Sequence, residues 1–382
     1  MENTGALKGI TVLDLSRLLP GPFCSMILAD HGADVIAIED KKQYARDGLF
    51  VPPVQRNKRH MSLDLKTAAG RGIFYRMLET ADVVLEGFRP GVTERLGVDY
   101  PTLKEKKPDI IYCSVTGYGQ TGPYRDRAGH DINYLATAGI LDVMGEADRP
   151  PAIPGIQIAD IAGGGMNAAI GILLALFAKE RTGQGQYVDI SMTDGMMSLL
   201  PVSLLLREFT GKSPQRADSM FSHRYACYNT YETADGRAIC IGAVESRFWG
   251  ILCEHLGFPE FSQHQYDDAR RDEVIAAFRA AFRQKTMAEW ERTLLPLNAC
   301  AQTVATLDEA LENPLFKDRD MVVRLPGAAE DTPALGVPVK LSDTPGAIRT
   351  PPPAFGENTF DILSAYGYSP EEIQAMVEAD IV

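Results

Sequence analysis

The sequence lacks several features by which a function is often assigned. Its six cysteines show no C-x-x-C spacing, and no group of residues has the spacing of a metal site. Basic residues are few, with 38 Lys and Arg against 51 Asp and Glu, and the formal net charge of −13 disfavours nucleic acid and anionic membranes as partners. The start of the chain has no basic region followed by an apolar one, so we expect no signal peptide and a cytoplasmic protein with reduced thiols.

Long apolar runs are also scarce, since only the stretch from Ile161 to Ala178 is apolar enough to be considered as a membrane span. Three glycines lie near the start of this stretch, and Lys179, Glu180 and Arg181 follow it directly. We therefore expect a buried helix at this position and no membrane partner.

The composition is that of a globular protein with a core of normal size. Hydrophobic residues make up 45% and charged residues 23% of the 382 positions, and this length suits two domains. We expect a large α/β domain over residues 1–200 and a smaller α+β domain over 220–325. The proline-rich segment 326–382 is expected to return to the large domain.

Strand and helix patterns alternate through the first 200 residues. The expected strands lie at 10–15, 34–39, 61–65, 83–88, 110–115 and 186–192, and the expected helices at 21–31, 67–80, 131–144 and 161–180. This alternation predicts a Rossmann-like parallel sheet covered by helices. In the second region, a hairpin over 228–243 with its turn at Asp235-Gly236 precedes helices at 246–256, 272–283 and 287–295.

One glycine motif resembles a dinucleotide-binding fingerprint. Gly117-Tyr118-Gly119-Gln120-Thr121-Gly122 has the required spacing and follows an expected strand. The fingerprint also needs a helix that opens within it, so that the helix N-terminus meets the pyrophosphate. A polar loop, Pro123 to Arg127, follows here instead. We therefore interpret the motif as a turn beside a ligand and expect no NAD.

Three titratable residues stand out as candidates for chemistry. His130 precedes an expected helix, Asp160 lies at a glycine-rich helix start, and Glu245 ends the expected hairpin. Backbone N–H groups at a helix start can stabilise both the carboxylate and an oxyanion. Each residue could instead cap a helix or lie in a solvated loop. Composition and spacing alone leave both interpretations open.

Several motifs occur in the order found in the class III CoA-transferase and 2-methylacyl-CoA racemase superfamily. The segment Gly129-His130-Asp131-Ile132-Asn133-Tyr134 resembles the active-site segment of the racemases. The other matching segments are 7–15 with 20–23, Arg56-Asn57-Lys58-Arg59, Leu63-Asp64-Leu65-Lys66, Phe88-Arg89-Pro90-Gly91-Val92, 116–123 and Thr182-Gly183-Gln184-Gly185-Gln186. They extend from about residue 7 to about residue 250, so the chain is identified as a member of this superfamily.

The resemblance implies a fold, an assembly and a site. It implies a large α/β domain, a small domain and a homodimer of interlocked subunits. His130 and Asp160 are expected to flank the substrate α-carbon, and Glu245 to orient the histidine. The CoA contacts that the resemblance implies are Leu63, Lys66, Gly87, Phe88, Arg89, Arg95, Gly122, Asp131 and Tyr134. No cofactor is expected, because CoA binds as part of the acyl-CoA thioester substrate.

The charges agree with a CoA site and reveal one departure from the superfamily. Six basic residues of an acidic chain fall in the matching segments and could meet the CoA phosphates: Arg56, Lys58, Arg59, Lys66, Arg89 and Arg95. Relatives usually carry a basic residue in or just after the second strand, where this chain has Ala37 and Asp40. Lys41, Lys42 or Arg46 could replace it.

Two enzymatic functions and one binding function are compatible with this resemblance. A racemase or epimerase of 2-methylacyl-CoA thioesters would use His130 and Asp160 as acid and base on opposite faces of the α-carbon. A class III CoA-transferase would use the aspartate as a nucleophile that forms a mixed anhydride. Those enzymes usually carry another residue in place of His130, which favours the racemase. A non-catalytic acyl-CoA-binding protein would not need the three candidate residues together.

Overall fold

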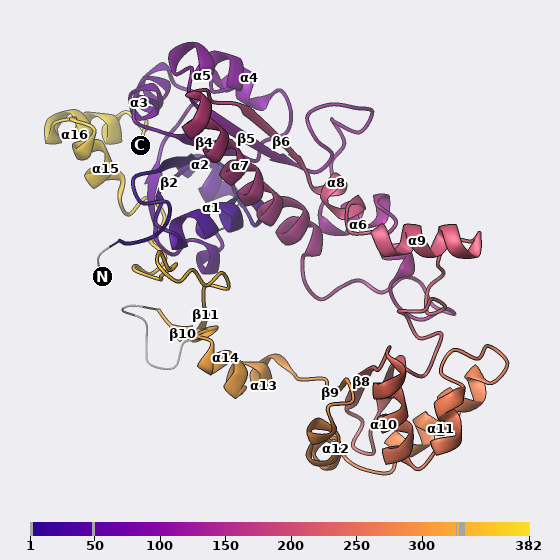
Figure 1. Cartoon of the computed structure of the whole chain (residues 1–382). Helices are drawn as coiled ribbons and strands as arrows, with labels where there is room; N and C mark the ends of the chain where they lie inside the picture. The colour runs from indigo at the N-terminus through magenta and orange to yellow at the C-terminus, as the bar shows by residue number, and fades with distance from the viewer. Residues whose placement is uncertain (1–2, 48–49, 326, 328–332) are drawn as a thin grey trace. The chain divides into compact units, whose positions relative to one another are not determined.

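The computed structural model describes residues 3–47, 50–325, 327 and 333–382, and the chain divides into two compact units (Figure 1). The large unit comprises residues 1–140, 154–199 and 314–382, and the small unit comprises 141–153 and 200–313. The segment 141–153, which sequence analysis placed in the large domain, belongs to the small unit.

A six-stranded parallel sheet forms the centre of the large unit. Its strand order is β3 (Lys58–Ser62), β2 (Asp34–Glu39), β1 (Thr11–Asp14), β4 (Val83–Glu86), β5 (Ile111–Thr116) and β6 (Tyr187–Ser191). All neighbouring strands are parallel, which confirms the predicted α/β class and gives the Rossmann order. Strand β3 begins earlier than expected, because the charged run Lys58-Arg59-His60 conceals a largely buried strand.

Helices cover both faces of this sheet. The helices of the large unit are α1 (Pro20–Asp30), α2 (Lys41–Asp47), α3 (Ala68–Leu78), α4 (Val92–Leu96), α5 (Tyr100–Lys106), α6 (Asp131–Thr137), a π-helix (Ala159–Met166), α7 (Asn167–Thr182), α8 (Met192–Met197), α14 (Pro314–Asp318), α15 (Thr359–Ala365), α16 (Pro370–Glu378) and a 3₁₀ turn (Pro52–Val54). A strand pair, β10 (Val322–Arg324) and β11 (Pro333–Leu335), completes it. The helix expected over 131–144 ends at Thr137, because Gly139 adopts a φ of 80° that ends helical geometry.

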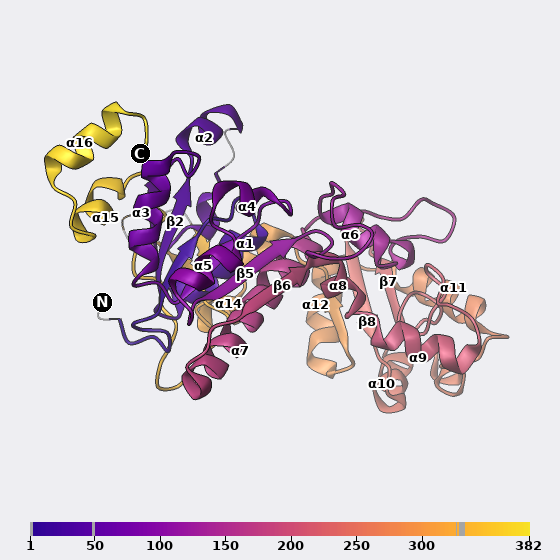
Figure 2. The ribbon, with the colours of Figure 1, turned by 90° about the horizontal axis from the view of Figure 1, so that it is seen from above.

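The C-terminal residues contribute to the core on one face of the sheet. Ile362, Leu363 and Ile373 are buried with Leu13 of β1 and Phe74 of α3. Figures 1 and 2 show α15 and α16 next to α3 and β2. This core therefore joins the two ends of the chain.

The helix α7 is only partly buried, in contrast to the expectation from its apolar sequence. Among the residues that the structure describes, the stretch Ala159–Thr182 alone is long and apolar enough to cross a membrane. Ala168 and Ile172 are buried, whereas Ile170, Leu174 and Phe177 are 54%, 65% and 61% exposed. The expected buried helix is thus buried along one face and exposes an apolar face within the single chain.

The small unit packs helices against a three-stranded sheet. Its elements are a 3₁₀ turn (Leu141–Val143), α9 (Pro201–Thr210), β7 (Tyr228–Glu232), β8 (Ala238–Gly242), α10 (Ser246–Leu256), a 3₁₀ turn (Pro259–Gln263), α11 (Arg271–Phe282), α12 (Met287–Leu294), a 3₁₀ turn (Leu295–Leu297), β9 (Ala301–Thr303) and α13 (Leu307–Glu312). The predicted hairpin is confirmed as the antiparallel pair of β7 and β8. Trp249, Phe278 and Phe282 lie at the centre of its core.

Candidate active site

A pocket of about 470 Å³ lies at the carboxyl ends of the central strands of the large unit. Residues that follow β1, β4, β5 and β6 line it, together with His130 and Asp160. The strand order reverses between β1 and β4, and in open α/β sheets ligands bind at such a switch point. A smaller hollow beside it is lined by residues that follow β2 and β3, and the two share Arg17 and Phe88.

A buried carboxylate, Asp14, holds the loop after β1 in place through hydrogen bonds. Asp14 accepts hydrogen bonds from the backbone N–H of Ser16 at 2.9 Å, from the Ser16 hydroxyl, and from the Ser25 hydroxyl at 2.5 Å. The ammonium of Lys58 lies 3.7 Å from Asp14 and donates to the carbonyl of Pro22. Burial lowers the pKa of Lys58 to about 8. This network therefore orders the loop that forms one wall of the pocket.

A second buried carboxylate supports the loop after β4. Glu86 accepts a hydrogen bond of 2.7 Å from the backbone N–H of Phe88, and burial raises its pKa to about 7. Gly87, Phe88 and Arg89 continue from this point along the pocket. The backbone of this segment is thus held in place next to the expected CoA.

The glycine motif after β5 forms a loop and not a helix start, as predicted. The chain runs from Thr116 to α6 at Asp131 without a helix. A Cβ atom on Gly117 or Gly129 would lie 2.4 or 2.7 Å from the ring of Tyr134, so both positions require glycine. These glycines allow Tyr134 to pack under the loop and donate to the carbonyl of Gly129 at 2.5 Å.

Asp160 lies in the first turn of the π-helix, half-buried in the pocket wall. Its pKa is raised to about 6, chiefly by burial and then by the charge of Asp131, while His130 opposes the increase. Its carboxylate accepts no hydrogen bond within the part of the chain that the structure describes. A carboxyl group that titrates near neutrality can both accept and return a proton.

The backbone donors expected at this helix start are already occupied. The N–H of Asp160 donates to the side chain of Asp131 at 3.0 Å, and the N–H of Ile161 donates to the carbonyl of Gln157 at 3.0 Å. The expectation that they stabilise an oxyanion is therefore wrong for these two groups. Asp131 of α6 and Gln157, which precedes the π-helix, satisfy them instead.

The three glycines after Asp160 serve close packing. A Cβ atom on Gly163 would lie 2.7 Å from the carbonyl oxygen of Met192, and one on Gly164 would lie 2.9 Å from Pro20. A Cβ atom on Gly165 would lie 2.8 Å from the ring of Phe23. The π-helix therefore approaches both α1 and α8 more closely than any larger residue permits, and this contact sets the position of Asp160.

His130 is exposed, lines the same pocket and directly precedes α6. Its backbone N–H donates to the side chain of Asn133 at 3.0 Å. Glu245 belongs to the small unit, where it precedes α10, so its role in orienting His130 remains a prediction.

The expected CoA contacts lie mainly along the carboxyl edge of the sheet. Gly87, Phe88, Arg89 and Tyr134 line the pocket, and Leu63 and Lys66 line the neighbouring hollow. The side chain of Asp131 accepts a hydrogen bond from the backbone N–H of Asp160, as described above. Arg95 lies in α4 and Gly122 in the loop after β5, and neither lines the pocket around Asp160.

Three of the six expected basic contacts have structural roles. Arg56 is 4% exposed and forms an ion pair of 2.7 Å with Asp30. Lys58 is buried in the Asp14 network, and Arg59 pairs with Asp34 at 2.6 Å. The interpretation of Arg56 and Lys58 as CoA contacts is wrong, because both are buried and paired with residues remote in sequence, whereas the Arg59 pair is exposed.

The proposed replacements for the missing basic contact also have partners. Lys41 and Lys42 pair with Asp380 at 2.7 and 2.8 Å. Lys66, one of the expected CoA contacts, pairs with Asp40 at 2.7 Å. Arg46 lies in α2. These lysines are exposed, so a phosphate group could compete with the carboxylates for them.

Sequence analysis missed three arginines of the pocket. Arg17, Arg125 and Arg127 line it together with Arg89. Arg127 stacks on Tyr124 at 3.6 Å, and the Nε atom of Arg125 is buried without a hydrogen-bond partner. The pattern Arg125-Asp126-Arg127 directly after a glycine-rich turn was the available signal.

Comparison with known proteins agrees with this fold. The profile of the family described as CoA-transferase family III matches residues 7–359. The chain therefore belongs to CoA-transferase family III, a family of acyl-CoA enzymes. A CAIB/BAIF family protein from Brucella suis has a similar structure, with a TM-score of 0.83, 31% identity, and coverage of 96% of this chain and 100% of that one.

Similar proteins within the family are named either as racemases or as CoA-transferases. The chain is 36% identical to "Alpha-methylacyl-CoA racemase" of Mus musculus, over 96% of this chain and 95% of the relative. It is 35% identical to the protein of the same name from Homo sapiens, over 99% and 97%. It is 33% identical to "Succinyl-CoA:mesaconate CoA-transferase" of Haloarcula marismortui, over 95% and 97%.

Proposed function

We propose that the chain is a racemase or epimerase of 2-methylacyl-CoA thioesters. The observation that carries this proposal is that His130 and Asp160 line one pocket at the carboxyl edge of the sheet. The charge of His130 acts on the pKa of Asp160, which supports their proximity. The similarity to two proteins named as racemases points the same way.

In the proposed reaction, one of the two side chains removes the α-proton of the thioester and leaves an enolate. The other side chain then delivers a proton to the opposite face, so that the stereocentre is inverted. Their roles exchange when the other enantiomer binds. The raised pKa of Asp160 suits this alternation, because both protonation states are accessible near neutral pH.

We further propose that CoA extends along the carboxyl edge of the sheet. The shared walls of the pocket and the hollow support a continuous path from Lys66 to Asp160. Arg89 and Lys66 would then contact phosphate groups, while Gly87 and Phe88 line the path of the pantetheine chain. The thioester would lie between His130 and Asp160.

The second candidate function is CoA transfer, which the four arginines of the pocket favour. In this reaction the Asp160 carboxylate attacks the thioester carbonyl, the CoA thiolate leaves, and a mixed anhydride forms. The carboxylate of a second acid then displaces the first acid from the aspartyl carbonyl. The CoA thiolate attacks the new anhydride at the carbonyl of the second acid, which forms the new thioester and releases Asp160. Arg17, Arg89, Arg125 and Arg127 would attract such an acid. The similarity to a CoA-transferase of Haloarcula marismortui supports this alternative.

Incubation of a 2-methylacyl-CoA in heavy water separates the two functions. We expect α-deuterium to appear without any acceptor acid. Asp160→Asn and His130→Gln should each reduce racemisation by roughly 10²-fold or more, because inversion requires a proton carrier on each face.

A CoA-transferase would give the opposite pattern in the same experiment. It would show no α-exchange, turnover only with an acceptor acid, and an Asp160 adduct that hydroxylamine traps. That result would falsify the proposed racemisation without affecting membership of the family.

A further inference from the structure

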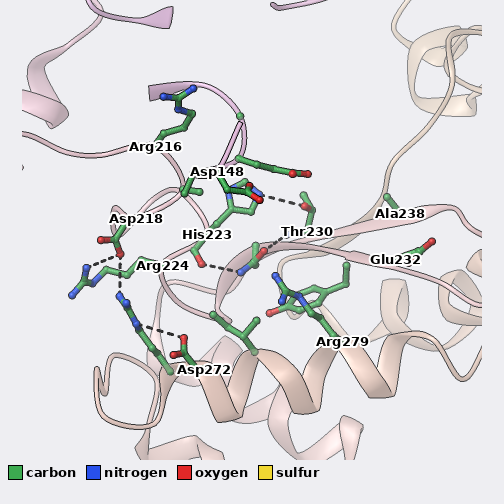
Figure 3. A pocket seen from close by; sticks show the side chains of 18 of the residues that line it. Asp148, Arg216, Asp218, His223, Arg224, Thr230, Glu232, Ala238, Asp272 and Arg279 are labelled. Atoms are coloured by element: carbon green, nitrogen blue, oxygen red, sulfur yellow. Dashed lines mark hydrogen bonds and ion pairs between the residues drawn. The ribbon is translucent and has the colours of Figure 1, made fainter. Parts of the chain in front are cut away.

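The small unit contains a cavity of about 940 Å³ that is built from its own residues alone (Figure 3). Its walls are strand β7, helix α11 and the segments 145–148 and 215–218. None of its lining residues is a predicted catalytic residue or CoA contact. The cavity is strongly charged, with six arginines and five carboxylates: Arg216, Arg224, Arg237, Arg271, Arg279 and Arg283, and Glu146, Asp148, Asp218, Glu232 and Asp272.

Four of the six arginines are paired with carboxylates and shape the wall. Arg224 and Arg271 both bind Asp218, at 2.7 and 3.0 Å, and Arg224 also pairs with Asp268 at 2.9 Å. Arg283 pairs with Glu232 at 2.6 Å, and Arg237 pairs with Glu309 at 2.6 Å. Because their charges are matched within the protein, these four need no further anion.

Arg279 differs from these four because its charge is unmatched. Within the described ranges, the guanidinium group of Arg279 forms no hydrogen bond or ion pair. Figure 3 shows it extending from α11 toward the side of the cavity that carries His223 and Thr230. Its charge also lowers the pKa of His223, second to burial, which places the two groups in the same electrostatic environment. A cationic side chain therefore faces the cavity without a counter-ion.

Arg216 supplies a second incompletely satisfied guanidinium. Its Nε atom is buried and has no hydrogen-bond partner in the described structure. One terminal nitrogen donates to the carbonyl of Arg149 at 2.7 Å, and the nearest carboxylate, on Asp142, is 3.9 Å away and 75% exposed. Buried donors in folded proteins are almost always satisfied. The Arg216 side chain therefore keeps one donor unused at the edge of the cavity.

We propose that this cavity binds a small organic anion whose carboxylate or phosphate group is held by Arg279. The planar guanidinium group binds either kind of oxyanion through paired hydrogen bonds. Glu146 and Asp148 also line the cavity. The ligand therefore carries hydrogen-bond donors, such as hydroxyl groups, in addition to its anionic group.

Isothermal titration of the full chain with three matched probes tests this assignment. Glycerate carries a carboxylate and hydroxyl groups, glycerol 3-phosphate carries a phosphate in its place, and glycerol carries no charge. We expect saturable binding of at least one anion at millimolar concentration and no binding of glycerol. Saturation by one anion alone identifies the group that the site takes.

Single substitutions locate the bound anion. Arg279→Gln should weaken binding about tenfold or more. Arg292→Gln is the matched control, because Arg292 is an exposed arginine of the same unit that does not line the cavity. Arg279 has no partner in the described structure, so its replacement should leave the far-UV circular dichroism and the Tm unchanged.

Two results would overturn the proposal. One is the absence of saturable binding for both anions. The other is binding that Arg279→Gln leaves intact and Arg89→Gln removes, because the anion would then occupy the large unit.

Discussion

Two features raise the pKa of Asp160, its burial and the charge of the neighbouring Asp131. The charge of Asp131 can be removed by mutation. Asp131→Asn keeps an oxygen that can accept the hydrogen bond from the Asp160 N–H but loses the charge. The pKa of Asp160 should then fall below its present value of about 6. If ionised Asp160 is the base, the acid limb of kcat/KM should move to lower pH by roughly one pH unit.

The pH profile of a neighbouring variant provides the control. Asp126→Asn removes a carboxylate from the exposed loop before His130, and Asp126 does not line the pocket. Its acid limb should match that of the unaltered protein. An unchanged acid limb in Asp131→Asn would show that Asp160 does not control the rate in this range.

Arg89 should bind the substrate, whereas Arg59 should not. Arg89→Ala removes a cation that lines the pocket, and loss of a hydrogen bond to a charged group costs about 1.5–3 kcal/mol. We therefore expect the Kd for CoA to rise about tenfold or more. Arg59→Ala is the control, because Arg59 already pairs with Asp34, and its Kd should be unchanged. Equal affinity in the two variants would exclude Arg89 from the CoA site.

In the sequence, the candidate catalytic residues were easier to identify than the basic residues that contact CoA. His130 and Asp160, which lie 30 positions apart, were predicted together and line one pocket. Arg56 and Lys58 were wrongly assigned to CoA, because their partners Asp30 and Asp14 are distant in sequence and only the fold brings them together. The occupied N–H groups near Asp160 were equally unpredictable, since they depend on Asp131 and on a π-helical turn.

Among the helices, the π-helix should tolerate substitution least. In Gly164→Ala the new Cβ atom would lie 2.9 Å from Pro20 and 3.0 Å from Met192. Overpacking of this kind typically costs about 1–3 kcal/mol. We expect calorimetry to show a lower Tm, and activity to fall as well, because the same contact positions Asp160.

Gly72→Ala in α3 is the matched comparison. The position is helical, and a Cβ atom there would meet nothing within 4 Å. Alanine should therefore stabilise the helix by roughly 0.5–1 kcal/mol and raise the Tm. A Gly164→Ala protein as stable as the unaltered chain would mean that α1 and α8 can move apart at little cost.

The expected elements mostly match the structure where the sequence pattern is periodic. The predicted β2 and α10 have the bounds found in the structure, Asp34–Glu39 and Ser246–Leu256. The amphipathic helix α9 was not predicted, and segment 141–153 was assigned to the wrong unit. Local patterns do not encode which unit a connecting segment packs against, because that depends on contacts far along the chain.

The exposed apolar face of α7 bears on the assembly of the whole molecule. Ile170, Leu174 and Phe177 recur at helical spacing, and patches of this kind usually mark an interface. We propose that a second copy of the chain covers this face, in agreement with the homodimer that the family resemblance implies. Sedimentation velocity at micromolar concentration should then show a stable dimer.

A pair of charge substitutions tests this interface. Leu174→Glu and Phe177→Glu together should shift the protein toward monomer, because two carboxylates would have to be buried. Leu307→Glu is the control, since Leu307 is 72% exposed on α13 and lies outside this face. A monomer before mutation, or association of the unaltered protein with lipid vesicles in place of dimerisation, would contradict the proposal.

The return of the C-terminal residues to the large unit has a consequence for synthesis on the ribosome. All six strands of the parallel sheet are complete once Ser191 has been made, yet Ile362, Leu363 and Ile373 join the core on one of its faces. Most of the small unit, residues 200–313, lies between these segments in the sequence, so this unit can fold first. Until the last residues emerge, the nascent chain carries a formed sheet whose apolar face is incompletely covered, and chaperones that recognise such surfaces should bind it during this interval.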